Sequence, residues 1–273
     1  MKTAMINGID MAYRDEGAGQ LILFIHAFPL HSVIWERQIV AFSPQHRVIA
    51  PDLRGLGASA RGSGAASVDQ YADDLAALLG HLEIEQATVV GLSLGGYISF
   101  ALWRRHRERI AALILADTRA GADTEEGKQG REKNAQLAEA EGPGAIADQM
   151  LPKLLGPNAP AALHEEVRAI IESNDSAGIA AALRAMAARP DSTPLLATID
   201  VPTLVIVGAD DTLTPPSEAE AMFNAIPGCR IAQLPSAGHL SNMEAPEAFN
   251  ARVAEFLTPR QTFGIGGGGG GKW

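Results

Sequence analysis

The sequence predicts an α/β fold in which a mainly parallel, eight-stranded sheet is covered by helices on both faces. Two observations carry this prediction. Continuous apolar runs of strand length recur along the chain and alternate with helical patterns, as in parallel sheets that are buried on both faces. Between residues 120 and 200 only helical patterns remain, which indicates a helical cap inserted into the sheet domain. We therefore expect a core domain formed by residues 1–119 and 201–257, with a cap formed by residues 120–200.

A pair of antiparallel strands is predicted at the start of the chain. The dipeptide Asn7-Gly8 lies between two alternating segments, which is a strong hairpin signal. Six buried strands are predicted to follow, because six short apolar runs are continuous rather than alternating. They span residues 21–25, 47–50, 87–90, 111–116, 203–207 and 230–234.

Helical patterns fill most of the intervals between these runs. Ser67 and Gln70 have the spacing of a capping box at the start of a helix over residues 68–82. Another helix is expected after Ser93, and a last one over residues 246–257, where proline suits the first turn. Four helices are predicted in the cap, over residues 124–141, 146–155, 161–173 and 176–188.

Composition and charge exclude several classes of partner. The formal net charge of −10 repels nucleic-acid phosphates and anionic lipid surfaces. No stretch approaches the roughly 18 consecutive apolar residues of a membrane span, and residues 1–8 lack a signal-peptide pattern. We therefore expect a cytoplasmic protein, a monomer or homo-oligomer, without nucleic-acid or membrane partners.

The single cysteine, Cys229, excludes an intramolecular disulfide. The glycine-rich segment 258–273 is expected to be a disordered tail.

A candidate nucleophile, Ser93, lies between a predicted strand and a predicted helix. Glycine stands two residues before it and two residues after it, in the string Gly91-Leu92-Ser93-Leu94-Gly95. A serine held on a sharp turn requires such glycines, because side chains at these positions would keep the strand and the helix apart. The string and its context therefore predict a nucleophile elbow.

The chain resembles the α/β-hydrolase superfamily from its first hairpin to Leu257. Besides the elbow, the resemblance rests on two further motifs. Residues 26–29 (His-Ala-Phe-Pro) are similar to the oxyanion loop of the family, although Ala27 stands where the family usually has glycine. Residues 52–59 are similar to the D-x-R-G-x-G-x-S segment of the family. The resemblance implies the α/β-hydrolase fold.

A serine nucleophile needs a base and an acid that orients the base, and in this fold both follow the serine in the chain. His239 comes after the last predicted strand, so it arrives at the sheet edge where ligands bind. Asp210 and Asp211 come after the preceding strand. The family pattern G-x-x-D-x-x-x-P matches Gly208 and Pro215 around Asp211. The resemblance therefore implies Asp211 as the orienting acid, and Asp210 as a turn or cap residue.

The oxyanion hole of such a site needs two backbone N–H donors. Leu94, the residue after the nucleophile, supplies one, and the resemblance implies that Phe28 supplies the other. His26 is expected to brace the same loop, while a role as a competing catalytic base stays open. Asp52 and Arg54 are expected to brace a second loop through hydrogen bonds and a salt bridge.

Contacts to the substrate are predicted from apolar residues near these groups and in the cap, namely Leu30, Leu154, Leu213 and Leu240. The sequence shows neither a metal-ligand spacing nor a dinucleotide fingerprint, so we expect no metal and no cofactor. Residues 119–200 carry eight basic and thirteen acidic side chains, which disfavours a strongly anionic substrate. An anionic lactone would need a cation near the cap, such as Arg119 or Lys153.

The sequence thus favours a hydrolase of carboxylic esters with small to medium acyl chains, acting through Ser93 and an acyl-enzyme intermediate. Serine rather than aspartate at the elbow argues against enzymes that form an alkyl ester with a carboxylate. The segments around Pro215 and His239 look like those of 3-oxoadipate enol-lactonases, so a small-molecule lactone is an alternative substrate. Cofactor-free perhydrolysis is a further alternative. A ligand-binding signalling protein with the hydrolase fold is a hypothesis of a different class.

Overall fold

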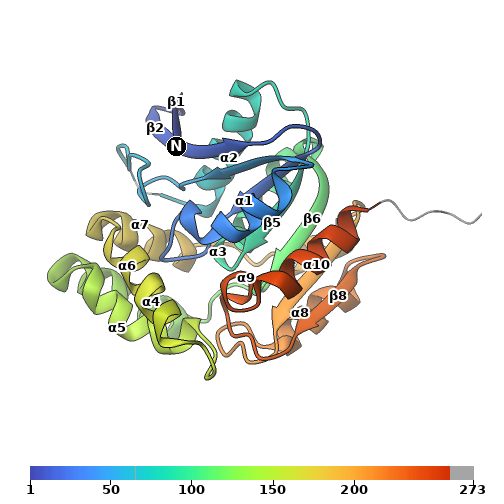
Figure 1. Ribbon diagram of the computed structural model, residues 1–273. Coiled ribbons are helices and arrows are strands. Elements are labelled where there is room, and N and C mark those ends of the chain that lie inside the picture. The colour runs from blue at the N-terminus through green and yellow to red at the C-terminus, as the bar shows by residue number, and fades with distance from the viewer. Residues whose placement is uncertain (65, 259–273) are drawn as a thin grey trace, which may run out of the picture.

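The computed structural model describes residues 1–64 and 66–258, so the predicted tail lies outside the described residues from position 259 onward. An eight-stranded sheet forms its centre, in the order β1-β2-β4-β3-β5-β6-β7-β8 (Figure 1). β1 and β2 pair antiparallel, as do β2 and β4, and all other pairs are parallel. The strands are β1 (Lys2–Ile6), β2 (Ile9–Glu16), β3 (Leu21–Ile25), β4 (Arg47–Pro51), β5 (Ala87–Leu92), β6 (Ile110–Ala116), β7 (Thr203–Gly208) and β8 (Arg230–Leu234). The predicted fold class is confirmed.

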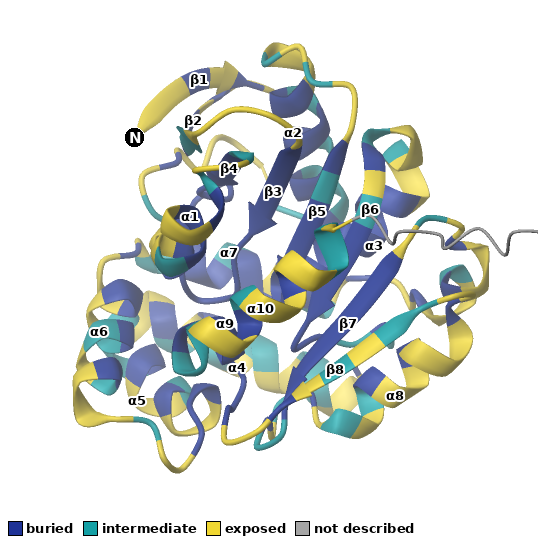
Figure 2. Ribbon diagram, turned by 45° about the vertical axis from the view of Figure 1, so that its right-hand side comes forward, coloured by how far each residue is buried: buried dark blue, intermediate teal, exposed yellow. Residues whose placement is uncertain are grey.

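Helices cover both faces of the sheet, with α1 and α10 in front of it and α3 behind it in Figure 2. The helices are α1 (Glu36–Phe42), α2 (Val68–His81), α3 (Leu94–His106), α4 (Glu125–Glu141), α5 (Pro143–Leu154), α6 (Ala161–Glu172), α7 (Ser176–Ala187), α8 (Pro216–Ala225), α9 (Ser241–Glu244) and α10 (Pro246–Leu257). Three short 3₁₀ helices are η1 (Ser32–Trp35), η2 (Arg107–Arg109) and η3 (Thr193–Thr198). The sequence patterns did not predict α1, α8 or α9. Among the described residues, no helix is long and apolar enough to cross a membrane.

Most residues of the central strands are buried, which explains their continuous apolar sequences. Every residue of β3 and β7 is buried, whereas the edge strand β8 alternates between half-buried and exposed residues up to the buried Leu234 (Figure 2). Three aromatic rings join the sheet to the helices in front of it. The ring of Trp35 lies 4.7 Å from that of Phe24 on β3 and 6.0 Å from that of Phe249 on α10. This contact fixes the α10 end of the chain against the sheet.

The start of α2 confirms only half of the predicted capping box. The Ser67 side chain accepts a hydrogen bond from the Gln70 N–H at 3.0 Å, as an N-cap does. The Gln70 side chain, however, donates to Asp74 at 2.9 Å instead of turning back to the N-cap. The same buried carboxylate accepts two hydrogen bonds from Arg54.

The inserted helices α4–α7, hereafter the cap helices, lie together beside the carboxyl ends of the strands (Figure 1). α4 packs against α7 and α5 against α6. Asn174, between α6 and α7, connects them to the sheet domain. Its side chain accepts from the Gly57 N–H at 2.7 Å and donates to the Pro29 carbonyl at 3.0 Å. A buried side chain from this insert therefore holds the loop that contains Phe28.

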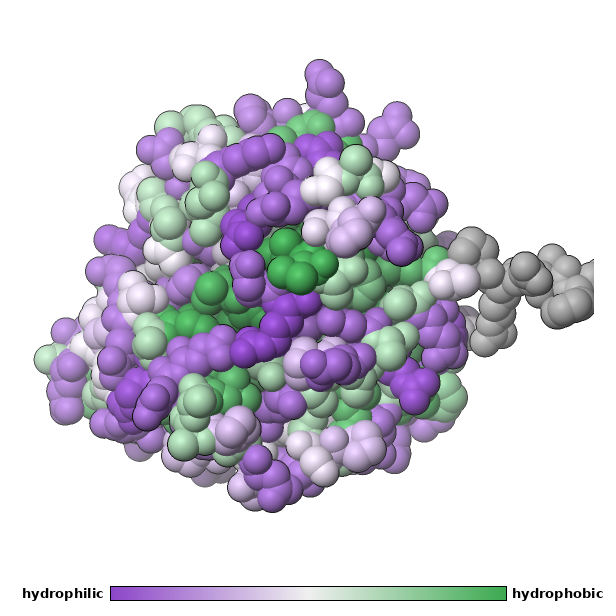
Figure 3. All heavy atoms as spheres, in the orientation of Figure 1, coloured by the Kyte–Doolittle hydropathy of each residue, from purple (hydrophilic) through white to green (hydrophobic). Residues whose placement is uncertain are grey.

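Apolar residues on the face of the molecule in Figure 3 gather in small areas separated by hydrophilic ones. The large apolar side chains that are exposed belong to scattered elements, from Met1 and Met5 near one edge of the sheet to Ile231 on β8 at the other. Such scatter is normal for a globular domain. Apolar burial is thus concentrated in the core between sheet and helices.

α7 approaches the sheet domain closely at Gly178, which faces the backbone of Gly55. A Cβ atom at Gly178 would lie 1.7 Å from the Gly55 carbonyl oxygen, so Gly178→Ala must push the cap helices away. We expect the free energy of unfolding to fall by about 1–3 kcal/mol. Gly130→Ala on α4 is the matched control, because a Cβ atom there meets nothing within 4 Å and alanine favours the helix by roughly 0.5–1 kcal/mol. Urea denaturation measures both, and equal midpoints for the two variants would contradict the packing.

Candidate active site

Ser93 is held on the predicted elbow, between the end of β5 and the start of α3. Its backbone is strained, with φ at +56°, a region that side chains rarely adopt. Two hydrogen bonds fix this conformation. The Ser93 N–H donates to the Ala116 carbonyl at 2.9 Å, and the Thr118 hydroxyl donates to the Ser93 carbonyl at 2.8 Å. The end of β6 therefore supports the serine from the next strand.

The glycines around Ser93 are required by close contacts. A Cβ atom at Gly91 would lie 2.3 Å from the Gly95 carbonyl oxygen, and one at Gly95 would lie 2.2 Å from the Ile25 carbonyl oxygen. Both distances are far below van der Waals contact. Only glycine therefore fits at these two positions.

The structure brings Ser93, His239 and Asp211 together, although they are far apart in the chain. His239 Nε2 lies 2.8 Å from Ser93 Oγ, and His239 Nδ1 lies 2.8 Å from Asp211 Oδ2. His239 and Asp211 are buried, while Asp210 is half-buried. Asp211, and not its neighbour, is therefore the carboxylate in contact with the imidazole.

The turn after β7 orients the Asp211 carboxylate. Oδ1 accepts from the N–H groups of Leu213 (2.8 Å) and Thr214 (3.0 Å), and Oδ2 accepts from the Thr214 hydroxyl (2.6 Å). Burial raises the pKa of Asp211, but the hydrogen bonds from His239 and Thr214 and the charge of the imidazolium outweigh burial and hold it below its ordinary value. The carboxylate is thus kept ionised.

The contact with Asp211 shifts the pKa of His239 in the opposite direction. Burial lowers the pKa of the imidazole, but the hydrogen bond to Asp211 and the charge of that carboxylate outweigh burial and raise the pKa. A buried histidine that gains proton affinity in this way is suited to take a proton from Ser93 Oγ. The alignment of the three groups is the one a serine nucleophile needs.

Two further carboxyl groups, which carry no recognisable signal in the sequence, hold the loops of this site. Asp117, after β6, accepts hydrogen bonds from the Gly208 N–H at 2.8 Å and from the Ser241 hydroxyl, so it joins the Asp211 turn to the His239 loop. Glu244 accepts from the N–H groups of Gly238 (3.0 Å) and Gly156 (2.8 Å). It thereby ties the His239 loop to the segment between α5 and α6.

His26 braces the loop after β3, as predicted from the sequence. Its Nε2 accepts from the Leu53 N–H at 3.0 Å, so its Nδ1 carries the proton that is shared with the Ala27 carbonyl at 3.0 Å. Burial lowers the pKa of His26 to about 4. His26 is thus a neutral structural group with both ring nitrogens engaged.

Asp52 braces the neighbouring loop by accepting from the N–H groups of Ser32 (2.9 Å) and Ala58 (2.8 Å).

The two N–H groups expected to form the oxyanion hole belong to Phe28 and Leu94. Leu94 is the first residue of α3, where an N–H has no partner within the helix. In the described part of the chain, neither of these N–H groups is paired with an acceptor. Both are available as donors, and Phe28 lines the same cavity as Ser93.

A cavity of about 140 Å³ adjoins Ser93 and His239. Its other lining residues are Phe28, Tyr97, Arg119, Arg131, Met150, Met186, Leu213 and Thr214. Of the four leucines predicted to contact substrate, Leu213 lines this cavity, whereas Leu30, Leu154 and Leu240 are buried in the core outside its lining. Arg119 lines the cavity, while Lys153 is exposed at the end of α5. Among the described residues, no group of three His, Cys, Asp or Glu side chains is placed to hold a metal ion.

The sheet order, the elbow and the contacts of Ser93 define a hydrolase of the α/β class. A model of the Alpha/beta hydrolase family matches residues 22–252, and the chain belongs to this family. The resemblance stated from the motifs is therefore confirmed.

Three relatives show where in the family the chain lies. A thermophilic esterase from Thermogutta terrifontis, solved with malate bound, is 42% identical with a TM-score of 0.91, over 94% of this chain and 98% of that one. The 3-oxoadipate enol-lactonase 2 of Acinetobacter baylyi is 34% identical over 239 residues, 85% of this chain and 86% of its own length. The enol-lactonase from Burkholderia xenovorans LB400 is 31% identical with a TM-score of 0.87, over 94% of this chain and 100% of that one. The chain is similar to this esterase and enol-lactonase branch.

The carboxyl group of Asp117 generates a pH prediction. Burial, then the nearby charge of Asp211, raises its pKa from 3.8 to about 8. Between pH 3.8 and about pH 8 the folded protein holds a proton that the unfolded chain has released. The contribution of Asp117 to the free energy of unfolding is therefore full below about pH 4 and is lost as the pH rises toward 8. Asp117→Asn keeps the shape and does not titrate. Its free energy of unfolding relative to wild type should therefore increase from about pH 5 to about pH 8 and then level off.

Urea denaturation at a series of pH values measures this difference. Asp210→Asn is the control for the loss of a carboxyl group at the same edge of the sheet. A difference between Asp117→Asn and wild type that is independent of pH would contradict a protonated Asp117.

Proposed function

We propose that this hydrolase cleaves carboxylic esters with small to medium acyl chains, with Ser93 as the nucleophile. The observation that carries the proposal is the continuous hydrogen-bonded chain from Ser93 Oγ through His239 to Asp211, with 2.8 Å at each step. A serine hydroxyl is a weak nucleophile at neutral pH, and such an arrangement activates it. The esterase from Thermogutta terrifontis, 42% identical to this chain, supports the assignment.

Acylation begins when Ser93 Oγ attacks the ester carbonyl carbon and His239 Nε2 takes the hydroxyl proton. Asp211 stabilises the imidazolium that forms and keeps the ring in the required orientation. The oxygen of the tetrahedral intermediate accepts hydrogen bonds from the N–H groups of Phe28 and Leu94, which have no acceptor of their own among the described residues. The imidazolium then gives its proton to the leaving alcohol, and Ser93 carries the acyl group.

Deacylation repeats these steps with water. His239 takes a proton from water, the hydroxide attacks the acyl carbonyl, and the Ser93 oxygen leaves with the proton returned by His239. The cavity limits what can be acylated, because about 140 Å³ is well below the usual roughly 300–1,000 Å³ of ligand pockets. Phe28, Met150 and Leu213 give this space apolar walls, which suits a short acyl chain.

Lactones are a second candidate substrate, since a lactone is a cyclic ester and needs the same groups. Two relatives named enol-lactonases support this reading, at 34% and 31% identity. One feature of the cavity supports it as well. An anionic lactone would need a cation near the cap, and Arg119, one of the two candidates for it, lines the cavity.

Substitution of the nucleophile tests the proposal. Ser93→Ala should lower turnover of p-nitrophenyl butyrate by about 10³-fold or more, because no acyl-enzyme can form. Initial rates of p-nitrophenolate release for wild type and variant measure the effect. Wild-type turnover that does not depend on Ser93 would overturn the proposal, and its complete absence across a panel of esters and lactones would favour a binding protein.

The two adjacent aspartates allow a sharper test. Asp211→Ala should lower kcat for p-nitrophenyl butyrate by about 10³- to 10⁴-fold, because the imidazole loses its orienting partner. Asp210→Ala is the matched control, one residue away and without contact to His239, and should keep most of the activity. Steady-state kinetics of both variants decides the matter, and the reverse ranking would show that Asp210 is the acid.

A further inference from the structure

The turn that carries the Phe28 N–H needs support from other parts of the chain. β3 ends at Ile25, and the residues after it form a tight turn that is closed by a hydrogen bond from the Leu30 N–H to the Ala27 carbonyl at 3.0 Å. Phe28 lies within this turn, and its N–H has no acceptor among the described residues. An N–H that stays free for a substrate oxygen does not fix its own position. The geometry of the turn therefore depends on contacts of its other backbone groups.

One of these contacts comes from the cap helices. The Pro29 carbonyl, within the same turn, accepts a hydrogen bond from the Asn174 side-chain nitrogen at 3.0 Å. This nitrogen also donates to the Ile170 carbonyl at 3.0 Å, and the Asn174 side-chain oxygen accepts from the Gly57 N–H at 2.7 Å. Only 4% of Asn174 is exposed. A single buried side chain thus joins the Phe28 turn, the loop after β4 and the end of α6.

The amide of Asn174 matches the groups that surround it. A primary amide offers two N–H donors and a carbonyl acceptor at fixed positions. Two carbonyl oxygens face its nitrogen and one N–H faces its oxygen, so each polar atom of the side chain has the partner that it needs. A buried network that is fully paired holds its members in one geometry. A carboxylate at the same position would place an oxygen against the Pro29 carbonyl.

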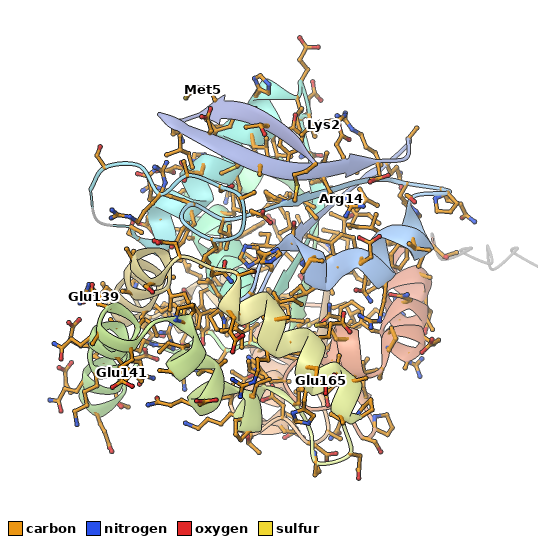
Figure 4. The ribbon with its side chains drawn as sticks, turned by 60° about the vertical axis from the view of Figure 1, so that its left-hand side comes forward. Lys2, Met5, Arg14, Glu139, Glu141 and Glu165 are labelled. Atoms are coloured by element: carbon orange, nitrogen blue, oxygen red, sulfur yellow. The ribbon has the colours of Figure 1, made fainter. Side chains whose placement is uncertain are left out.

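The outer side of the cap helices differs from this junction. Glu139 and Glu141 at the end of α4 and Glu165 on α6 are exposed, and the first two lie at the periphery of the molecule (Figure 4). An exposed polar group that loses a hydrogen bond regains one from water, whereas a buried group does not. The position of the cap helices is therefore linked to that of the Phe28 turn through Asn174.

We propose that Asn174 is a positioning residue for ester hydrolysis, which holds the Phe28 turn so that the Phe28 N–H is directed at the oxygen of the tetrahedral intermediate. This rests on the proposed function, since the intermediate forms on Ser93. The cap helices then contribute to the reaction itself as well as lining the cavity. A donor that is displaced by about 1 Å loses much of its effect on the rate, because its interaction with the developing charge depends on exact placement.

Two substitutions test this role. Asn174→Ala removes every contact of the side chain, whereas Asn174→Asp keeps its shape and the acceptor for the Gly57 N–H but loses the donor to Pro29. At about pH 9, where the new carboxyl group is ionised, both should lower kcat for p-nitrophenyl butyrate by about 10- to 100-fold and leave KM within about threefold. The loss falls on kcat because acylation and deacylation both pass through an oxyanion. Wild-type kcat in Asn174→Asp would overturn the proposal.

Asp175→Ala is the matched control. Asp175 is the next residue, and its side chain caps α7 by accepting from the Gly178 N–H at 3.0 Å. Loss of this cap destabilises the same end of the cap helices without a change in the contacts of the Phe28 turn. The urea midpoint should therefore fall while kcat is unchanged. A loss of kcat equal to that in Asn174→Ala would show that any damage to the cap helices lowers activity, and would overturn the specific role of Asn174.

An inhibitor that resembles the tetrahedral intermediate separates positioning from partial unfolding. Ser93 Oγ adds to the carbonyl carbon of propyl trifluoromethyl ketone, His239 takes the serine proton, and the ketone oxygen becomes the negatively charged oxygen of a hemiketal. The inhibition constant should rise in Asn174→Ala by the same factor as kcat/KM for the ester falls. A partly unfolded enzyme would be slower without a change in this constant, so an unchanged constant would overturn the proposal. Absence of Ser93-dependent turnover in wild type would instead overturn the proposed function.

Hydrogen exchange in wild type covers the case in which the Asn174 variants do not fold. Coupling between two sites is reciprocal, so formation of the hemiketal should in turn stabilise the Asn174 contacts. Exchange of the Gly57 N–H, which Asn174 protects, should slow when the ketone is added, as followed by NMR. Ser93→Ala forms no hemiketal and should show no change. Exchange at Gly57 that is the same with and without the ketone in wild type would contradict the link.

Discussion

The arrangement of this site depends on one constraint, which is that the imidazole of His239 is buried and must still be able to hold a proton. Burial alone would make His239 a weak base. The hydrogen bond to Asp211 reverses this effect. Asp211 stays ionised because the hydrogen bond from His239, together with two N–H groups and a hydroxyl of its own turn, outweighs burial. The turn after β7 is therefore part of the chemistry of the histidine.

The alignment of Ser93, His239 and Asp211 also requires that three loops keep fixed positions. The end of β6 supplies most of this support: Ala116 and Thr118 hold the serine, and Asp117 holds both the Asp211 turn and the His239 loop. A parallel sheet makes this possible, because the ends of neighbouring strands meet at one edge. β6 carries none of these three aligned side chains, but the segment at its end contacts the elements that hold all of them.

Local sequence signals predicted the groups that depend on backbone geometry. Ser93 was found from its flanking glycines, and His239 from its place after a strand, because both features are written in short segments. The cavity lining could not be predicted in this way. Leu30, Leu154 and Leu240 are as apolar as Leu213 but face the core, and only the packing of the helices against the sheet decides which side chains border the cavity. Asp117 gives no signal either, because its role arises from partners 91 and 124 residues away.

Charge shows most clearly why composition is a poor guide to a site. The excess of acidic residues between 119 and 200 predicted a preference against anionic substrates, yet the charges that border the cavity are cationic. Exposed carboxylates such as Glu139 act through water and salt, which weaken their field within about 10 Å. Arg119 and Arg131 act across a small cavity of lower dielectric, where the same charge has a several-fold larger effect. The electrostatic character of this site is therefore set by these few side chains, whatever the net charge of the segment that supplies them.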